Sequence, residues 1–154
     1  MIEVPVAPEG AALTLDNKRI LSVSSFSGAR CQCTHGGYRA GYFDGLTIID
    51  RQRNMYRVRS ARLIECPMWK KVAFLFFGGW REVALDIDFQ GRIEQGRIVQ
   101  MVTDSLRQDE EFWSAGGDVD ELIADIAATR DVEAIISRLE YPGSGLNRLP
   151  GRQD

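Results

Sequence analysis

The chain has 154 residues, of which 44% are hydrophobic and 27% are charged. This composition is typical of one folded domain and excludes a disordered, collagen-like or coiled-coil chain. The formal charge is −3, from 19 basic and 22 acidic residues, which argues against general affinity for nucleic acid or anionic membranes.

The first strand signals follow an opening segment that contains two prolines. Residues up to about Asn17 read as an extended arm with at most one short strand. Residues 19–26 give a weak strand pattern and residues 42–49 a better one, which ends in the polar turn 50–54. In residues 55–64, Tyr56, Val58 and Ile64 fall on one face and Arg57 and Arg59 on the other, as in a half-buried strand.

A hairpin is predicted at Phe77-Gly78-Gly79-Trp80, because two glycines between apolar runs suit a tight turn. Its register would place Phe74 opposite Val83, Val72 opposite Leu85 and Lys71 opposite Asp86. One face would then be core, formed by Val72, Phe74, Phe76, Val83, Leu85, Ile87 and Phe89.

After Gly91 the apolar period changes from two to 3.6 residues. A helix of about 14 residues would bury Ile98, Met101, Val102 and Leu106. Two further helices are predicted after the N-cap residues Asp118 and Asp131. Their inward residues would be Val119, Leu122, Ile123 and Ile126, then Val132, Ile135, Ile136 and Leu139.

Strands followed by helices predict an α+β fold, with an antiparallel β-meander sheet covered on one face by C-terminal helices. We expect one domain over residues 1–142, with no evident internal repeat, and a flexible tail over residues 143–154. The longest apolar run, residues 72–77, is too short to cross a bilayer, and residues 1–5 lack the pattern of a secretion signal. We therefore expect a cytoplasmic protein with no membrane partner.

A metal site is one hypothesis for function. Cys31, Cys33 and His35 alternate, so an extended chain would project them from one face, and Cys66 could complete a tetrahedral zinc site. The C-x-C spacing differs from the C-x2-4-C pairs typical of zinc sites, and we favour ordinary buried cysteines and no cofactor. His35 is the sole histidine, and no carboxylate is indicated to support a Cys and His catalytic pair.

A second alternative is nucleic-acid binding by a basic stripe. Its members could contact phosphates while Tyr56 or Trp69 stacks on bases, but Asp86, Asp88 and Glu82 are expected to neutralise much of it. We do not favour it. The stripe consists of Arg51, Arg53, Arg57, Arg59, Arg62, Lys70 and Lys71.

Charge is divided unevenly along the chain. Residues 1–80 have a net charge of +5 and residues 81–154 a net charge of −8. Residues 104–125 hold eight acids and one arginine, a net charge of −7, with two aromatic residues among them. Aromatic anchors within a charged rim are typical of a binding surface, although these two could equally be core. The candidate partner-binding residues are Asp109, Glu110, Glu111, Phe112, Trp113, Asp118, Asp120 and Glu121; the alternative surface is Leu75, Phe77 and Trp80.

The layout of residues 40–140 resembles small cytoplasmic immunity proteins of bacterial toxin systems. The resemblance lies in Tyr42-Phe43-Asp44-Gly45 leading to Ile48-Ile49-Asp50, then a meander, then helices that carry Phe112-Trp113, Asp120-Glu121-Leu122 and Ile135-Ile136-Ser137-Arg138-Leu139. Such proteins bind and block a toxin and catalyse nothing, so the resemblance implies a non-enzymatic inhibitor of a protein partner. The acidic stretch favours a basic toxin as that partner.

Overall fold

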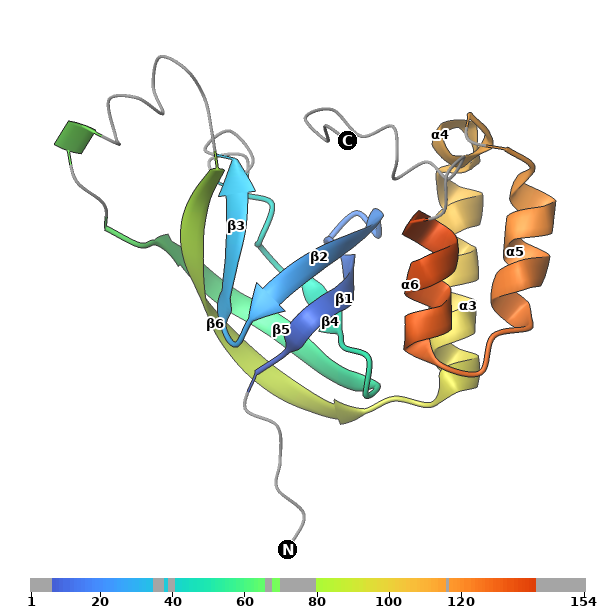
Figure 1. Ribbon diagram of the computed structural model, residues 1–154, viewed down its shortest axis with the longest axis horizontal. Helices are drawn as coiled ribbons and strands as arrows, with labels where there is room; N and C mark the ends of the chain where they lie inside the picture. Colours follow the sequence, from blue (N-terminus) through green and yellow to red (C-terminus); the bar gives the residue numbers. More distant parts are fainter. Residues whose placement is uncertain are drawn as a thin grey trace, which may run out of the picture.

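The computed structural model describes residues 7–34, 38, 41–65, 68–69, 80–115 and 117–140. Six strands come first: β1 (Glu9–Leu15), β2 (Leu21–Ser27), β3 (Arg30–Thr34), β4 (Thr47–Ile49), β5 (Asn54–Leu63) and β6 (Trp80–Arg92). Four helices follow: α3 (Gln95–Gln108), α4 (Glu110–Ser114), α5 (Val119–Ala127) and α6 (Val132–Glu140). The predicted mixture of strands followed by helices is confirmed (Figure 1).

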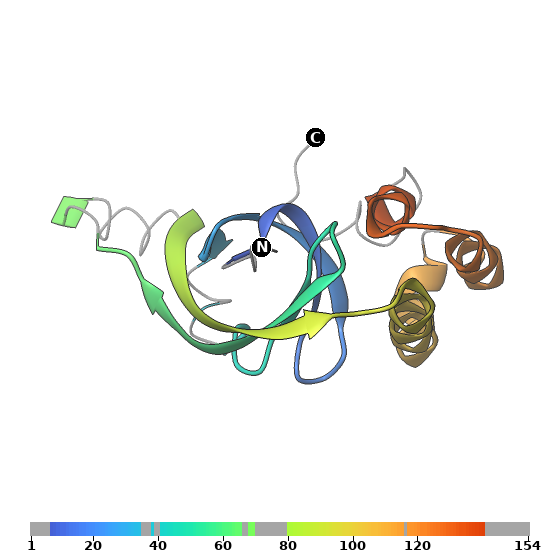
Figure 2. The same ribbon diagram turned by 90° about the horizontal axis from the view of Figure 1, so that it is seen from below.

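The sheet closes into an antiparallel barrel in the order β1-β2-β3-β6-β5-β4, and the prediction of an open meander was wrong. Two meanders, β1-β2-β3 and β4-β5-β6, are joined because β1 pairs with β4 and β3 pairs with β6. Figure 2 shows the strands curved into a ring, with the helices gathered on one side of it. The ring is least regular between β2 and β3, whose single register pair among the described residues is Ser27 with Arg30.

Two hydrophobic cores lie on opposite sides of the barrel wall. One fills the barrel and consists of Ala12, Phe26, Cys31, Cys33, Phe43, Leu46, Ile48, Tyr56, Val58, Val83 and Leu85. The other lies between the outer barrel surface and the helices, and includes Leu13, Leu15, Leu21, Ile49, Ile98, Val102, Leu106, Trp113, Ile126, Ile135 and Leu139. The helices therefore cover β1, β2 and β4, rather than one face of an open sheet.

β1 lies where an arm with at most one short strand was predicted. Its side chains alternate between the two cores: Ala12 and Thr14 face the barrel, and Leu13 and Leu15 face the helices. Because both faces are buried, the strand shows little of the polar and apolar alternation that identifies a half-buried strand. Its sequence signal was therefore weak.

The prediction for β5 is largely confirmed, whereas that for β6 is confirmed only in part. Tyr56 and Val58 are buried and Arg57 and Arg59 are exposed, as expected. A bulge between Val58 and Ser60 then shifts the inward positions by one residue, so Ile64 leaves the predicted face. On β6, Val83 and Leu85 are core, but Phe89 is 40% exposed.

The hairpin turn predicted at residues 77–80 lies largely outside the described residues. Its predicted pairing of Phe74 with Val83 is nevertheless wrong, because Val83 lies between Cys31 of β3 and Leu63 of β5. A residue in a sheet pairs with at most one residue on each side, and Cys31 and Leu63 already occupy both sides of Val83.

The β1–β2 and β4–β5 turns share one five-residue conformation, so the chain contains a repeat that the sequence did not make evident. The Asp16 carboxylate accepts hydrogen bonds from the backbone N–H groups of Lys18 and Ile20, each at 2.8 Å. The Asp50 carboxylate accepts them from Gln52 and Asn54, each at 2.9 Å. Both turns also have an arginine at the fourth position.

The first strands of the two meanders pair antiparallel, with Leu13 opposite Ile49 and Leu15 opposite Thr47. The link between β2 and β3 is short, and the link between β5 and β6 is long.

Arg19 and Arg53, the fourth residues of the two turns, have positive φ angles of 61° and 65°. A side chain with a Cβ is strained in this left-handed conformation by about 1 kcal/mol or more, whereas glycine adopts it freely. Neither turn follows the usual preference for glycine at this position.

Replacing Arg19 with glycine is therefore expected to stabilise the protein by about 0.5–1 kcal/mol, which raises Tm by about 2 °C in a domain of this size. Calorimetric unfolding of Arg19→Gly and Arg19→Ala measures the effect. Alanine keeps the Cβ and should give no such gain. An Arg19→Gly variant less stable than Arg19→Ala would contradict the strain argument.

Candidate protein-binding surface

The three helices predicted around the acidic stretch are confirmed. α3 has 14 residues and buries Ile98, Val102 and Leu106, as expected from the 3.6-residue period. The Asp118 carboxylate caps α5 by accepting hydrogen bonds from the N–H groups of Asp120 and Glu121, at 2.9 and 3.4 Å. Asp131 caps α6 in the same way. Asp118 thus has a structural role within the predicted surface.

The aromatic residues of the predicted surface belong mainly to the core. Trp113 is 2% exposed and packs among the helices, and Phe112 is half-buried against the same cluster. Their rings meet edge to face, with centroids 5.3 Å apart. Trp113 is therefore excluded as an exposed anchor, and the core interpretation holds for it.

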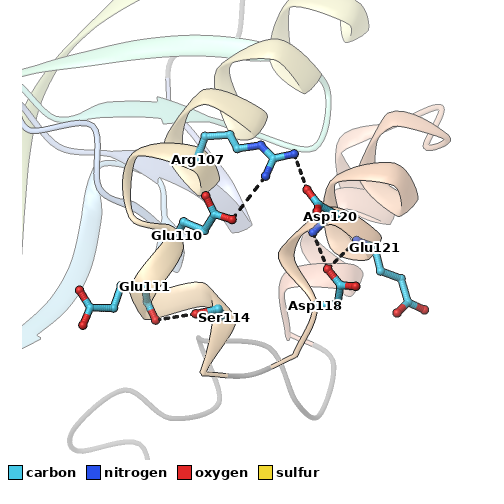
Figure 3. Close-up of polar contacts among 7 residues, drawn as sticks. All are labelled: Arg107, Glu110, Glu111, Ser114, Asp118, Asp120 and Glu121. Atoms are coloured by element: carbon cyan, nitrogen blue, oxygen red, sulfur yellow. Dashed lines mark hydrogen bonds and ion pairs between the residues drawn. The ribbon is translucent and has the colours of Figure 1, made fainter.

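Arg107 forms ion pairs with two acids of the predicted surface, Glu110 and Asp120. Its guanidinium lies 3.5 Å from the carboxylate of Glu110 and 2.5 Å from that of Asp120, so it links α3 to α5 (Figure 3). All three side chains are about half exposed or more, so each pair contributes at most about 1 kcal/mol. Glu110 and Asp120 are therefore partly neutralised.

The remaining acids do not form one continuous patch. Glu111 and Glu121 point in opposite directions in Figure 3, and Asp109 is half-buried at the junction of α3 and α4. Glu121 and Asp125 are exposed one turn apart on α5, a helix that contains no lysine or arginine. Residues four apart share a helix face, so these two carboxylates present one anionic surface to solvent.

Leu75 and Phe77, two of the three residues of the alternative surface, lie outside the described residues. The backbone of Trp80 begins β6, where it pairs with Thr34 of β3.

Among the described members of the basic stripe, ion pairs within the sheet are shown for Arg59 alone, which is less than the predicted neutralisation; Glu82 pairs with Arg30, outside the stripe. Arg57, Arg59 and Arg62 are exposed on β5. Arg59 contacts the carboxylates of Asp86 and Asp88 on β6, at 2.9 and 3.2 Å. Of the other members, Arg51 is exposed, Arg53 is half-buried, and Lys70 and Lys71 lie outside the described residues.

Cys31 and Cys33 both point into the barrel, so the prediction that they share one face of an extended segment is confirmed. His35 and Cys66, the other proposed zinc ligands, lie outside the described residues. Burial, and secondarily the neighbouring Cys33, raise the pKa of the Cys31 thiol to about 12. The described residues hold no group of three or more side chains able to bind a metal ion.

Within the described part of the chain, every helix is too short or too polar to span a bilayer. Comparisons of the chain with protein-family models, curated proteins and solved structures gave no match.

The buried Cys31 thiol is expected to resist alkylation in the native protein. With a pKa of about 12, roughly one thiol in ten thousand is ionised at about pH 8, against about one in ten at the ordinary value of 9.0. Iodoacetamide labelling of a Cys66→Ser variant, followed by mass spectrometry of the peptide with Cys31, tests this. Labelling should accelerate about a hundredfold or more in denaturant. Equal rates in both conditions would show that the thiol is accessible and readily ionised.

Proposed function

We propose that the protein is a non-enzymatic binding module that inhibits a basic protein partner, in the manner of the immunity proteins that its layout resembles. The observation that carries this proposal is the exposed pair Glu121 and Asp125 on α5. These two carboxylates make no ion pair with a described residue, and α5 contains no basic residue.

Electrostatics explains what such a surface can do. Like charges four residues apart destabilise a helix by a few tenths of a kcal/mol. Glu121 gains from the helix dipole because it lies in the first turn of α5, but Asp125 lies near the end of the helix and has no such gain. The pair creates a negative potential, which accelerates encounter with a positively charged partner and disfavours acidic ones. These properties fit a surface that binds a basic protein.

The barrel interior supports a binding role over catalysis in an enclosed chamber. Tyr56 is fully buried there, and Phe26 and Phe43 are each 4% exposed. Side chains fill the centre of this small barrel, as in other barrels of few strands. The two alternatives have less support: Arg59 is neutralised within the stripe, and the thiol of Cys31 favours its protonated form.

A charge-reversed double variant, Glu121→Lys with Asp125→Lys, tests the surface. The two changes have opposite effects on the stability of α5, because Glu121 is in the first turn of the helix and Asp125 is near its end. Their interactions with the helix dipole therefore largely cancel. A double variant of Glu9→Lys and Glu65→Lys is the matched control. It changes the net charge equally at exposed barrel positions.

The partner used is the protein encoded by the adjacent gene, since an immunity protein is expected beside its toxin. Stopped-flow association with that protein should be about tenfold slower for the α5 variant at low salt, with a weaker salt dependence, and nearly unchanged for the control. Failure of the wild-type protein to form this complex would contradict the immunity proposal. A complex with equal rates for both variants would exclude the α5 surface.

A further inference from the structure

One side of the barrel wall is open between β2 and β3. The two strands share a short turn, and Ser27 pairs with Arg30 beside it. Beyond that pair the strands diverge, as Figure 1 shows, and the described part of the chain has no further register pair between them. β2 is paired along its whole length with β1, and β3 along its whole length with β6. Residues 21–25 of β2 therefore have a strand on one side alone.

Alternate backbone groups of β2 point into this opening. The N–H of Asp16 donates to the carbonyl of Ile20 at 3.2 Å, which makes these two residues the first bonded pair of the β1–β2 hairpin. Bonded pairs alternate along an antiparallel ladder, so Ser22 and Ser24 are the next residues that bond to β1. Ser27 has the opposite parity and pairs with β3, which agrees with this direction. The N–H and C=O groups that point away from β1 are those of Leu21, Val23 and Ser25.

This edge of β2 lacks the features that normally protect an edge strand. Such strands are protected by charged side chains, proline, a bulge or a covering element. β2 has the sequence LSVSSFS, without charge or proline, and it pairs with β1 in one unbroken register. The helices α3 and α6 contact β2, but they pack on the face that carries Leu21 and Val23, and Ser25 is exposed. An uncharged, uncovered edge is a template for an added strand.

The side chains along the edge indicate what kind of segment fits it. Leu21 and Val23 face the core under the helices, so β-branched apolar residues are favoured opposite them. Ser22 and Ser24 face the barrel, where small hydroxyl residues are favoured. At the closed end of the opening, Arg30 is already paired with an acid of β6. A charged side chain would lose water at this edge without a matching charge on β2, so an uncharged segment is favoured.

We propose that the open edge of β2 binds an extended, uncharged segment of a partner protein, which adds to the barrel wall as an antiparallel strand. Its alternate backbone groups bond to those of Leu21, Val23 and Ser25. Antiparallel addition is favoured because such pairs are slightly more stable per residue than parallel ones. The site uses none of the acidic residues of α5 and does not depend on the proposed function.

Hydrogen exchange of the free protein tests whether the edge is open. The amides of Ser22 and Ser24, which bond to β1, should exchange at least about tenfold more slowly than those of Val23 and Ser25. Equal protection of all four amides would show that the edge is already occupied, and it would overturn the proposal.

The probe for binding is the peptide Thr-Ser-Val-Ser-Val, acetylated and amidated at its ends. Paired antiparallel with residues 21–25, it places its valines opposite Val23 and Leu21. An NMR titration to about 2 mM peptide should shift the amides of Val23 and Ser25 in a saturable way and slow their exchange. N-methylation of both valines removes donors that face β2 and should abolish binding, whereas N-methylation of both serines should weaken it less. No saturable shift, or equal binding of the unmodified and valine-methylated peptides, would overturn the proposal.

A matched pair of variants tests the same edge from the side of the protein. Ser25→Pro removes one donor of the edge and leaves the β1 ladder intact, because the N–H of Ser25 points away from β1. Ser25→Ala loses the same hydroxyl but keeps the N–H. Peptide affinity should fall about fivefold for Ser25→Pro and stay within about twofold for Ser25→Ala. Slow exchange of Ser22 and Ser24 in both variants shows that β1 and β2 remain paired, and equal peptide affinity of two such variants would contradict strand addition.

Discussion

Burial of β1 on both faces is the constraint on which the rest of the structure depends. Ala12 and Thr14 are fully buried in the barrel, and Leu13 and Leu15 are 1% and 7% exposed against the helices. Each leucine contributes about 1.5–3 kcal/mol through removal of its side chain from water. The same strand closes the barrel by pairing with both β2 and β4. One seven-residue segment therefore supports the sheet and the helices together.

The placement of the acidic helices follows from the burial of β1. The helices bury their apolar residues against β1, β2 and β4, so the remaining faces of α4 and α5 carry their acids outward. Pairing of β4 with β1 and of β5 with β6 brings the β4–β5 turn beside the start of α3. Much of the excess of acid in residues 104–125 lies on the solvent-facing sides of α4 and α5.

Features controlled by nearby residues could be predicted from the sequence. Asp118 and Asp131 cap helices because their carboxylates reach N–H groups two or three residues away. The alternation along β5 identified a strand for a similar reason. The closed barrel could not be predicted, because it depends on pairing between β1 and β4, which lie more than 30 residues apart.

The candidate site could be predicted only in outline. The excess of acid in residues 104–125 is evident from composition, but the role of each acid depends on tertiary contacts. Arg107 of α3 forms an ion pair with Asp120 of α5. The short helix α4 places Trp113 in the core. The β4–β5 turn and the start of α3 are about 40 residues apart in sequence, so no local pattern indicated that the N–H of Ile93 would donate to the carbonyl of Arg53.

The cooperative role of β1 is tested most directly by native-state hydrogen exchange. If β1 supports both cores, the amides of Leu13 and Leu15 should exchange with the same opening free energy as those of Val102 and Leu106 in α3, equal to the free energy of global unfolding. Exchange of α3 and α6 through a lower-energy opening that leaves β1 protected would contradict this account. It would show that the barrel is stable without the helices.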